Sequence, residues 1–276
     1  MTNTKVYLLD GGSVVLDGLL YYWNTGPSGE IRLPMYSVLI EHSDGLYLFD
    51  SGFDREYTVR NFPFLKAAQS PEQTIPGQLA KLGLSPADIN YVINSHYHFD
   101  HCGGNKHLVN ACTVCHKLEL EACGCPQPFE AVAYSDLSFC PALQEQRKQV
   151  AAEGSPAAPL APEASDIYTP RFETVTGDQE IAKGVWLFET PGHTAGHYSL
   201  MVELSGRRPM IFTGDAIYGK KSLDLMCISS FHLDPVASLR SMRRIKELAE
   251  RYDAEIFFSH DPSLYADYVR APGRYA

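Results

Sequence analysis

Residues 96–101 read His-Tyr-His-Phe-Asp-His, which places three imidazoles and one carboxylate in one short stretch of the chain. The apolar residues 91–93 directly before this cluster predict a short buried strand that leads into it. Side chains alternate along a strand, so the first two histidines should point to one side, and the aspartate and third histidine follow as the chain turns. Imidazole and carboxylate are ligands for zinc, manganese, iron or cobalt. The cluster therefore predicts a metal site on loops at one edge of a sheet.

Three further candidate ligands each follow a predicted strand, and they are His193, Asp215 and His260. Together with the cluster they amount to five of the chain's 10 histidines and two aspartates. One metal takes about four ligands, so this set predicts two metals that share a bridging residue. A carboxylate can bridge and an imidazole normally does not, which leaves Asp100 and Asp215 as candidates for the bridge.

Strands and helices alternate in both halves of the sequence. The pattern predicts an α/β (α+β) protein with two sheets packed together and helices outside. Asp234 and Pro235 predict a helix start, and apolar residues at helical spacing extend this helix over 235–251. We expect one domain over residues 1–276, with an irregular Ala/Pro-rich insertion at about 140–170. The other predicted elements are a hairpin over 35–41 and 46–49, a helix over 78–82 and strands at 185–188, 198–202, 210–212 and 256–258.

Charge and composition exclude several classes of protein. Lys+Arg 23 against Asp+Glu 33 gives a net charge of −10, which argues against binding driven by nucleic-acid phosphates. No apolar run approaches the roughly 18 residues of a membrane span, and the first residues do not resemble a signal peptide. The 7 cysteines are an odd number at irregular spacing, unlike a secreted disulfide scaffold. We therefore expect a cytoplasmic protein without membrane or nucleic-acid partners.

The remaining histidines carry weaker signals. His197 lies four residues after His193, which is a helical ligand spacing, but the neighbouring glycines make a helix improbable there. A structural role is therefore expected for His197. His116 is interpreted as an ordinary surface or turn residue, and His232 as a residue that borders the pocket.

The order His-x-His-x-Asp-His, followed by separate His, Asp and His, resembles the metallo-β-lactamase superfamily. Asp50, in Phe-Asp-Ser-Gly, matches a further element of that pattern. The resemblance implies an αββα sandwich over essentially the whole chain. It also distributes the ligands: His96, His98 and His193 on one metal, Asp100, His101 and His260 on the other, Asp215 as the bridge, and Asp50 behind the ligands.

Within the superfamily the chain is most similar to the lactonases. Tyr218 lies three residues after Asp215, and in acyl-homoserine lactonases a tyrosine at that offset lies over the metals and assists the lactone oxygen. Other segments resemble 4-pyridoxolactonases, namely 5–12, 94–106, 126–130, 134–139 and 231–235.

The resemblance implies a dinuclear zinc hydrolase that opens a small lactone ring with a hydroxide bridging the metals. Tyr218 would donate a hydrogen bond, and Asp100 or Asp215 would carry a proton to the leaving alkoxide. Two Zn²⁺ are expected, although manganese, iron or cobalt would also suit the ligands. A homodimer is implied by analogy. The substrate stays open between a 4-pyridoxolactone-like ring and an N-acyl homoserine lactone.

Two alternatives remain at this point. A thioester hydrolase resembling glyoxalase II has nearly the same metal motif, but Tyr218 favours a lactone. The lack of an evident basic C-terminal segment for glutathione also disfavours the thioester. From a different class, the chain could be a catalytically silent metal-binding protein.

Overall fold

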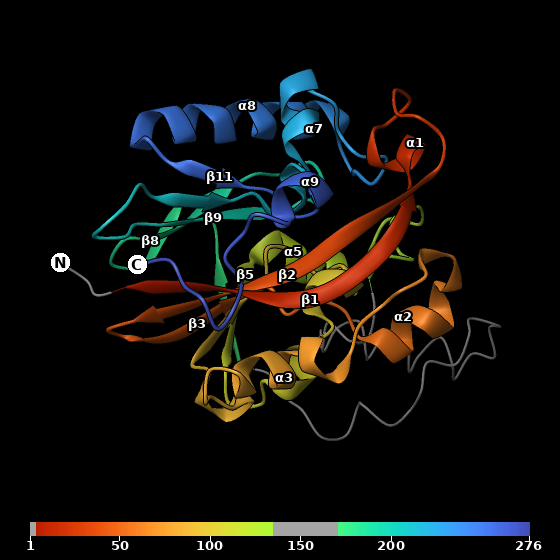
Figure 1. Ribbon diagram of the computed structural model, residues 1–276. Helices are drawn as coiled ribbons and strands as arrows, with labels where there is room; N and C mark the ends of the chain where they lie inside the picture. The colour runs from red at the N-terminus through yellow and green to blue at the C-terminus, as the bar shows by residue number, and fades with distance from the viewer. Residues whose placement is uncertain (1–3, 135–170) are drawn as a thin grey trace.

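Two β-sheets packed face to face form the centre of the computed structural model, which describes residues 4–134 and 171–276 (Figure 1). Helix α8 (Pro235–Tyr252) covers the outer face of one sheet, and α3 (Ile75–Ala80) lies on the far side of the other. The predicted arrangement of two mixed sheets flanked by helices is confirmed. The insertion expected at about 140–170 lies outside the described residues.

The first sheet has six strands, of which β1 to β3 are antiparallel and β3 to β6 are parallel. The predicted hairpin is present, with His42 paired to Gly45 across its turn. The paired strands β1 and β2 are 13 residues each, and they extend together towards α1 (Figure 1). In sheet order the strands are β1 (Lys5–Asp17), β2 (Glu30–His42), β3 (Gly45–Phe49), β4 (Tyr91–Ile93), β5 (Cys112–His116) and β6 (Arg171–Val175).

Three strands of the second sheet run in the same direction. β8 is antiparallel to β9, β9 is antiparallel to β10, and β10 is parallel to β11. The ends of β8, β10 and β11 therefore meet at one edge of the sheet, and these strands precede His193, Asp215 and His260. In sheet order the strands are β11 (Glu255–Phe257), β10 (Met210–Phe212), β9 (Tyr198–Val202), β8 (Val185–Glu189) and β7 (Gln179–Ala182).

Strand β9 is buried along its whole length because both of its faces are covered. Tyr198 and Leu200 lie in the core between the two sheets, whereas Met201 belongs to the cluster under α8. Burying one such apolar side chain stabilises the fold by about 1.5–3 kcal/mol. A shift of the strand by one residue would exchange its two faces, so these contacts fix the register. The register in turn fixes the loops at the edge of the sheet.

Helix α8 begins where the sequence predicts. The Asp234 side chain accepts hydrogen bonds from two backbone N–H groups of the first turn, and Pro235 occupies the first helical position. Met242 and Ile245 on its buried face are fully excluded from solvent against the second sheet. These contacts hold α8 against the second sheet, on the side of the molecule that carries Asp215.

The helix predicted over 78–82 instead spans Ile75–Ala80: Thr74 caps its first turn, and it ends two residues before the predicted end. Gly83, with φ of +72°, follows the helix as its expected stop. None of the helices in the described ranges is long and apolar enough to cross a membrane. The other helices are α1 (Gly18–Tyr21), α2 (Arg55–Asn61), α4 (Phe99–Cys102), α5 (Lys117–Gly124), α7 (Lys220–Leu225) and α9 (Pro262–Tyr265).

Candidate metal centre

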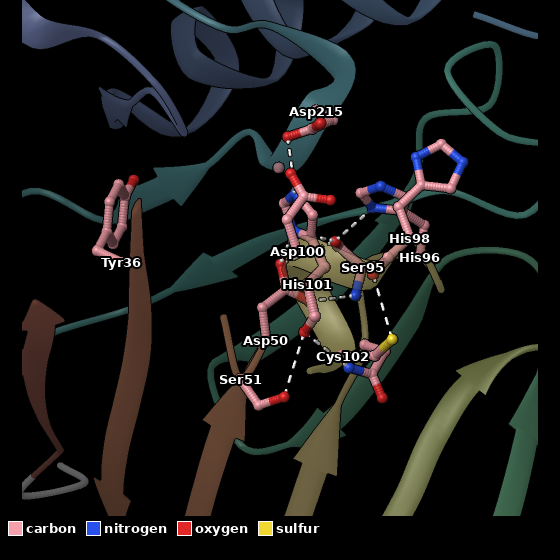
Figure 2. Close-up of polar contacts among 12 residues, drawn as sticks. Tyr36, Asp50, Ser51, Ser95, His96, His98, Asp100, His101, Cys102 and Asp215 are labelled. Carbon is pink, nitrogen blue, oxygen red and sulfur yellow. Dashed lines mark hydrogen bonds and ion pairs between the residues drawn. The ribbon is translucent and has the colours of Figure 1, made fainter. Parts of the chain in front are cut away.

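The loop after β4 alternates as the sequence predicts. His96 and His98 lie on one side with ring centroids 4.5 Å apart, while Tyr97 points away from them and is fully buried. The short helix α4 then turns the chain and carries Asp100 and His101 (Figure 2). The cluster therefore divides into two halves that belong to two neighbouring ligand groups.

The first ligand group consists of His96, His98 and His193, whose ligand atoms lie within 4.8 Å of one another. His193 Nδ1 lies 2.7 Å from the carbonyl oxygen of Phe231, so this nitrogen must carry the proton and donate it. The unprotonated Nε2 then lies 3.1 Å from His96 Nε2 and 3.0 Å from His98 Nδ1. Burial, together with the neighbouring imidazoles, holds the pKa values of His96 and His98 well below their ordinary value. Neutral rings with converging lone pairs fit a metal cation.

The second ligand group consists of Asp100, His101, Asp215 and His260, again with ligand atoms within 4.8 Å. Asp215 Oδ1 lies 3.1 Å from His101 Nε2 and 3.0 Å from His260 Nε2. His260 Nδ1 lies 3.1 Å from the carbonyl oxygen of Pro34 and donates to it, which leaves Nε2 as the atom that faces the carboxylate. Among the described residues, the buried His101 Nε2 and Asp215 Oδ1 have no hydrogen-bond partner. Burial alone would lower the pKa values of His101 and His260, but Asp215 raises both, so the space between these side chains attracts positive charge and the residues fit a metal.

Asp215 lies between the two groups, because its second oxygen, Oδ2, is 3.4 Å from His193 Nε2. Burial alone raises the pKa of Asp215, but the imidazoles of His101 and His260 outweigh it and hold that pKa well below the ordinary value. Asp100 has the opposite balance, since burial and the nearby Asp215 raise its pKa despite His101.

Asp50 lies behind the second group, at the outer position that the resemblance implies. Its φ of 57° is in the left-handed region, which aspartate tolerates better than most residues. The carboxylate accepts hydrogen bonds from Ser95 N and Ser95 Oγ, both at 2.8 Å, and from His101 Nδ1 at 2.8 Å (Figure 2). The proton on Nδ1 leaves Nε2 of His101 as the atom that faces the ligand group.

His197 belongs to neither ligand group and has the structural role expected from the sequence. It is fully buried, its Nδ1 lies 2.8 Å from Thr190 Oγ1, and its Nε2 accepts a hydrogen bond of 2.9 Å from the backbone N of Asp215. Burial and the neighbouring His193 lower the pKa of His197 to about 3, so the ring is neutral and can accept this bond. His197 thereby fixes the backbone of Asp215.

A cavity of about 340 Å³ borders both ligand groups. Tyr218 lies in its wall, with its ring centroid 4.9 Å from that of His260 and 6.3 Å from that of His193. Four polar side chains also line the cavity, namely Asn61, Glu130, Ser230 and His232, as expected for His232. Most of the remaining wall is apolar and includes Val14, Leu16, Leu33, Phe62, Leu65 and Phe99.

Two parts of this region were not predicted from the sequence. Part of the apolar wall comes from the far ends of β1 and β2, and the signal for it was the alternation of Val14 and Leu16. The second part is helix α5, whose Glu119 is fully buried next to the ligand loops. His116 was interpreted as a surface or turn residue, which is wrong: it is 4% exposed, and its side chain accepts a hydrogen bond from Leu118 N and caps α5.

Comparisons with known proteins point to one family. The sequence matches the metallo-beta-lactamase superfamily over residues 32–260, a span that holds all seven predicted ligands. An N-acyl homoserine lactonase from a Bacillus sp is 28% identical over 269 residues, which cover 95% of this chain and 94% of that protein. The N-acyl homoserine lactonase AttM of Rhizobium radiobacter is 28% identical over 288 residues and 100% of both chains.

Solved structures agree with these relatives. An N-acyl homoserine lactone hydrolase with the product N-hexanoyl-L-homoserine bound at its catalytic metal centre is 26% identical, with a TM-score of 0.81 over 100% of both chains. A quorum-quenching N-acyl homoserine lactone lactonase is 26% identical, with a TM-score of 0.80 over 100% of this chain and 99% of the other. Because the family match spans residues 32–260 and these structures share the two-sheet fold, the chain belongs to the metallo-β-lactamase superfamily, as predicted, with relatives in the lactonase branch.

Proposed function

We propose that the chain is a metal-dependent lactonase that opens the ring of a lactone bearing an apolar group. The observation that carries this proposal is the position of the two ligand groups: they share Asp215 and border a mainly apolar cavity in which Tyr218 lies beside them. The relatives found by sequence and by structure are lactonases, which supports the same reaction here and does not favour the thioester alternative.

Two divalent metals are the proposed cofactors, with zinc first and manganese, iron or cobalt as alternatives that the same ligands tolerate. When bound, such a pair lowers the pKa of a water and polarises a carbonyl oxygen. The residues proposed to hold one metal are His96, His98 and His193, those for the other are Asp100, His101 and His260, and Asp215 would contact both.

The chain's own side chains would bind the lactone and move the proton. Burial raises the pKa of Tyr218 well above its ordinary value, and Asp215 adds to the shift, so the hydroxyl keeps its proton and can donate to a lactone oxygen. Asp100 or Asp215 would carry a proton to the leaving alkoxide.

An N-acyl homoserine lactone is the substrate that the cavity favours. The acyl tail of such a molecule needs a hydrophobic groove, and Val14, Leu16, Leu33 and Leu65 supply one. Each methylene buried there contributes about 0.8 kcal/mol.

4-Pyridoxolactone is the second candidate, and a specific observation favours it. This flat, polar ring needs stacking and hydrogen bonds, and the cavity offers both the stacked rings of Phe62 and Phe99 and the side chains of Glu130 and His232. Among the described residues, the buried Glu130 Oε2 has no hydrogen-bond partner.

The test is a comparison of kcat/KM for N-hexanoyl homoserine lactone and 4-pyridoxolactone on the same zinc-loaded preparation. The proposal expects hydrolysis of at least one lactone, and the preferred one decides between the candidates. A folded, zinc-loaded protein that hydrolyses neither lactone would contradict the proposal. The homodimer and the cytoplasmic location expected from the sequence are further proposals, and sedimentation and cell fractionation test them.

A further inference from the structure

Glu119, in the first turn of α5, is fully buried next to the first ligand group. One of its carboxylate oxygens, Oε2, accepts a hydrogen bond of 3.2 Å from the backbone N of Tyr97. The other, Oε1, accepts one of 2.9 Å from the backbone N of Gly196. Tyr97 separates the first two histidines of the group, and Gly196 lies in the loop of His193. One side chain therefore joins two loops that are far apart in the sequence and carry all three ligands.

Close packing supports the same connection. A Cβ atom on Gly196 would lie 2.8 Å from Glu119 N and 2.8 Å from His116 Cβ, so the loop lies directly against the start of α5. His116 fixes this start in turn, because its Nδ1 accepts a hydrogen bond from Leu118 N and its Nε2 lies 2.8 Å from Glu189 Oε1. Glu189 ends β8, the strand that leads into the loop of His193.

Burying the carboxylate of Glu119 costs free energy, which its hydrogen bonds to the two ligand loops must offset. Burial raises the pKa of Glu119 to about 7, and the side chain of Thr194 together with the bonds from Gly196 and Tyr97 only partly offsets that effect. A neutral glutamine would avoid the cost of burying a charge, but its NH₂ group would face a backbone N–H. Only a carboxylate offers an acceptor to both loops.

We infer that Glu119 is a positioning residue that fixes the separation of the two ligand loops and thereby sets the affinity of the first group for its metal. The inference rests on the proposed metal centre, but it does not depend on which lactone is hydrolysed. Partners behind metal ligands typically change metal affinity by 10–100-fold when they are removed.

The test is zinc titration of the metal-free protein against a chromophoric chelator, for the native chain and Glu119→Gln. We expect one of the two sites to weaken by about tenfold or more while the other is unchanged. The matched control is Glu121→Gln, since Glu121 lies exposed on the same helix and should bind zinc like the native chain. Both titrations are repeated in a His260→Ala background, which disables the second ligand group. The zinc site that remains is then the first group, and its affinity should still fall in Glu119→Gln.

Unchanged zinc affinity in Glu119→Gln would overturn the inference, and so would equal weakening of both sites. Thermal unfolding of the metal-free variants separates positioning from stability: a lower Tm with native zinc affinity also contradicts it. If the glutamine variant does not fold, Glu119→Asp replaces it, because a carboxylate drawn back by one methylene cannot reach both loops and should give the same selective loss. A native chain that binds no zinc would instead contradict the proposed metal centre itself.

Discussion

Three ligand imidazoles are each held from the side opposite the metal centre. Carbonyl oxygens orient His193 and His260, whereas the Asp50 carboxylate orients His101. A carbonyl fixes the tautomer without adding charge, but a carboxylate also makes the ring a stronger ligand. The second group contains Asp100 as well, so it concentrates more negative charge than the first. We therefore expect it to hold its metal more tightly.

Tyr218→Phe should lower kcat by on the order of 10- to 100-fold, because it removes one oriented hydrogen-bond donor from the reacting centre. The ring itself stays, so the packing against His260 and the zinc content should be unchanged. Steady-state kinetics on the preferred lactone, with zinc measured per chain, check this. The control is Tyr265→Phe, which removes a hydroxyl that bonds Asp10 and does not line the cavity. Native kcat in Tyr218→Phe would exclude the proposed role.

At the scale of elements, the start of α8 holds the loop of His193. The backbone N–H groups of Leu233 and Asp234 donate to the carbonyl oxygen of Gly192 at 2.8 and 2.9 Å. Gly192 has φ of +133°, and a Cβ there would lie 2.2 Å from the backbone N of Ser238 in the helix. The loop and the helix therefore approach each other as closely as a glycine permits.

Gly192→Ala should accordingly lower the free energy of unfolding by about 3 kcal/mol or more, through both backbone strain and the clash with α8. Urea unfolding of the metal-free protein measures this. Gly83→Ala is the matched control, since Gly83 also has a positive φ of +72° but nothing lies within 4 Å of its Cβ position. Its loss should be about 1 kcal/mol. Equal losses in the two variants would show that the contact with α8 is unimportant.

The apolar wall is also a property of elements, because β1 and β2 extend together beyond the hairpin to form it. If the wall receives an acyl chain, kcat/KM should rise about fourfold per added methylene until the cavity is filled, which corresponds to about 0.8 kcal/mol each. Leu16→Asn should flatten this dependence while the shortest substrate is little affected. A series of N-acyl homoserine lactones from butanoyl to decanoyl checks it. A flat profile in the native chain would favour the compact pyridine lactone instead.

Over the whole molecule, the sequence predicted features that local patterns encode. The cluster at 96–101 and the short apolar runs before the other ligands lie where expected, because strand ends carry such loops. Features that depend on distant partners were missed. Leu33 belongs to the cavity only because β2 pairs with β1, and the role of Glu119 depends on α5 meeting two separate loops. No periodicity in the sequence predicts contacts between segments that lie so far apart along the chain.

Metal binding should also determine the stability of the whole chain. Without a metal, the buried Asp215 Oδ1 is balanced by the imidazoles of His101 and His260, at 3.1 and 3.0 Å. A metal at 1,000 times its Kd adds about 4 kcal/mol per site. At about 2–4 °C per kcal/mol for a chain of this size, dialysis against a chelator should lower the Tm by about 10 °C or more.

Zinc added back should restore both the Tm and the lactonase activity, with the tighter second group filling first. Differential scanning calorimetry at stepwise zinc-to-protein ratios measures this, and magnesium, which prefers oxygen ligands to imidazole, is the control ion. We expect the first equivalent to restore about half of the lost Tm, because the two sites contribute similar free energies at equal saturation. Activity should return only with the second equivalent, because the proposed reaction needs both groups. Full activity in the stripped, folded protein would contradict the metal-dependent mechanism, whereas activity that returns with one equivalent would limit that mechanism to a single metal.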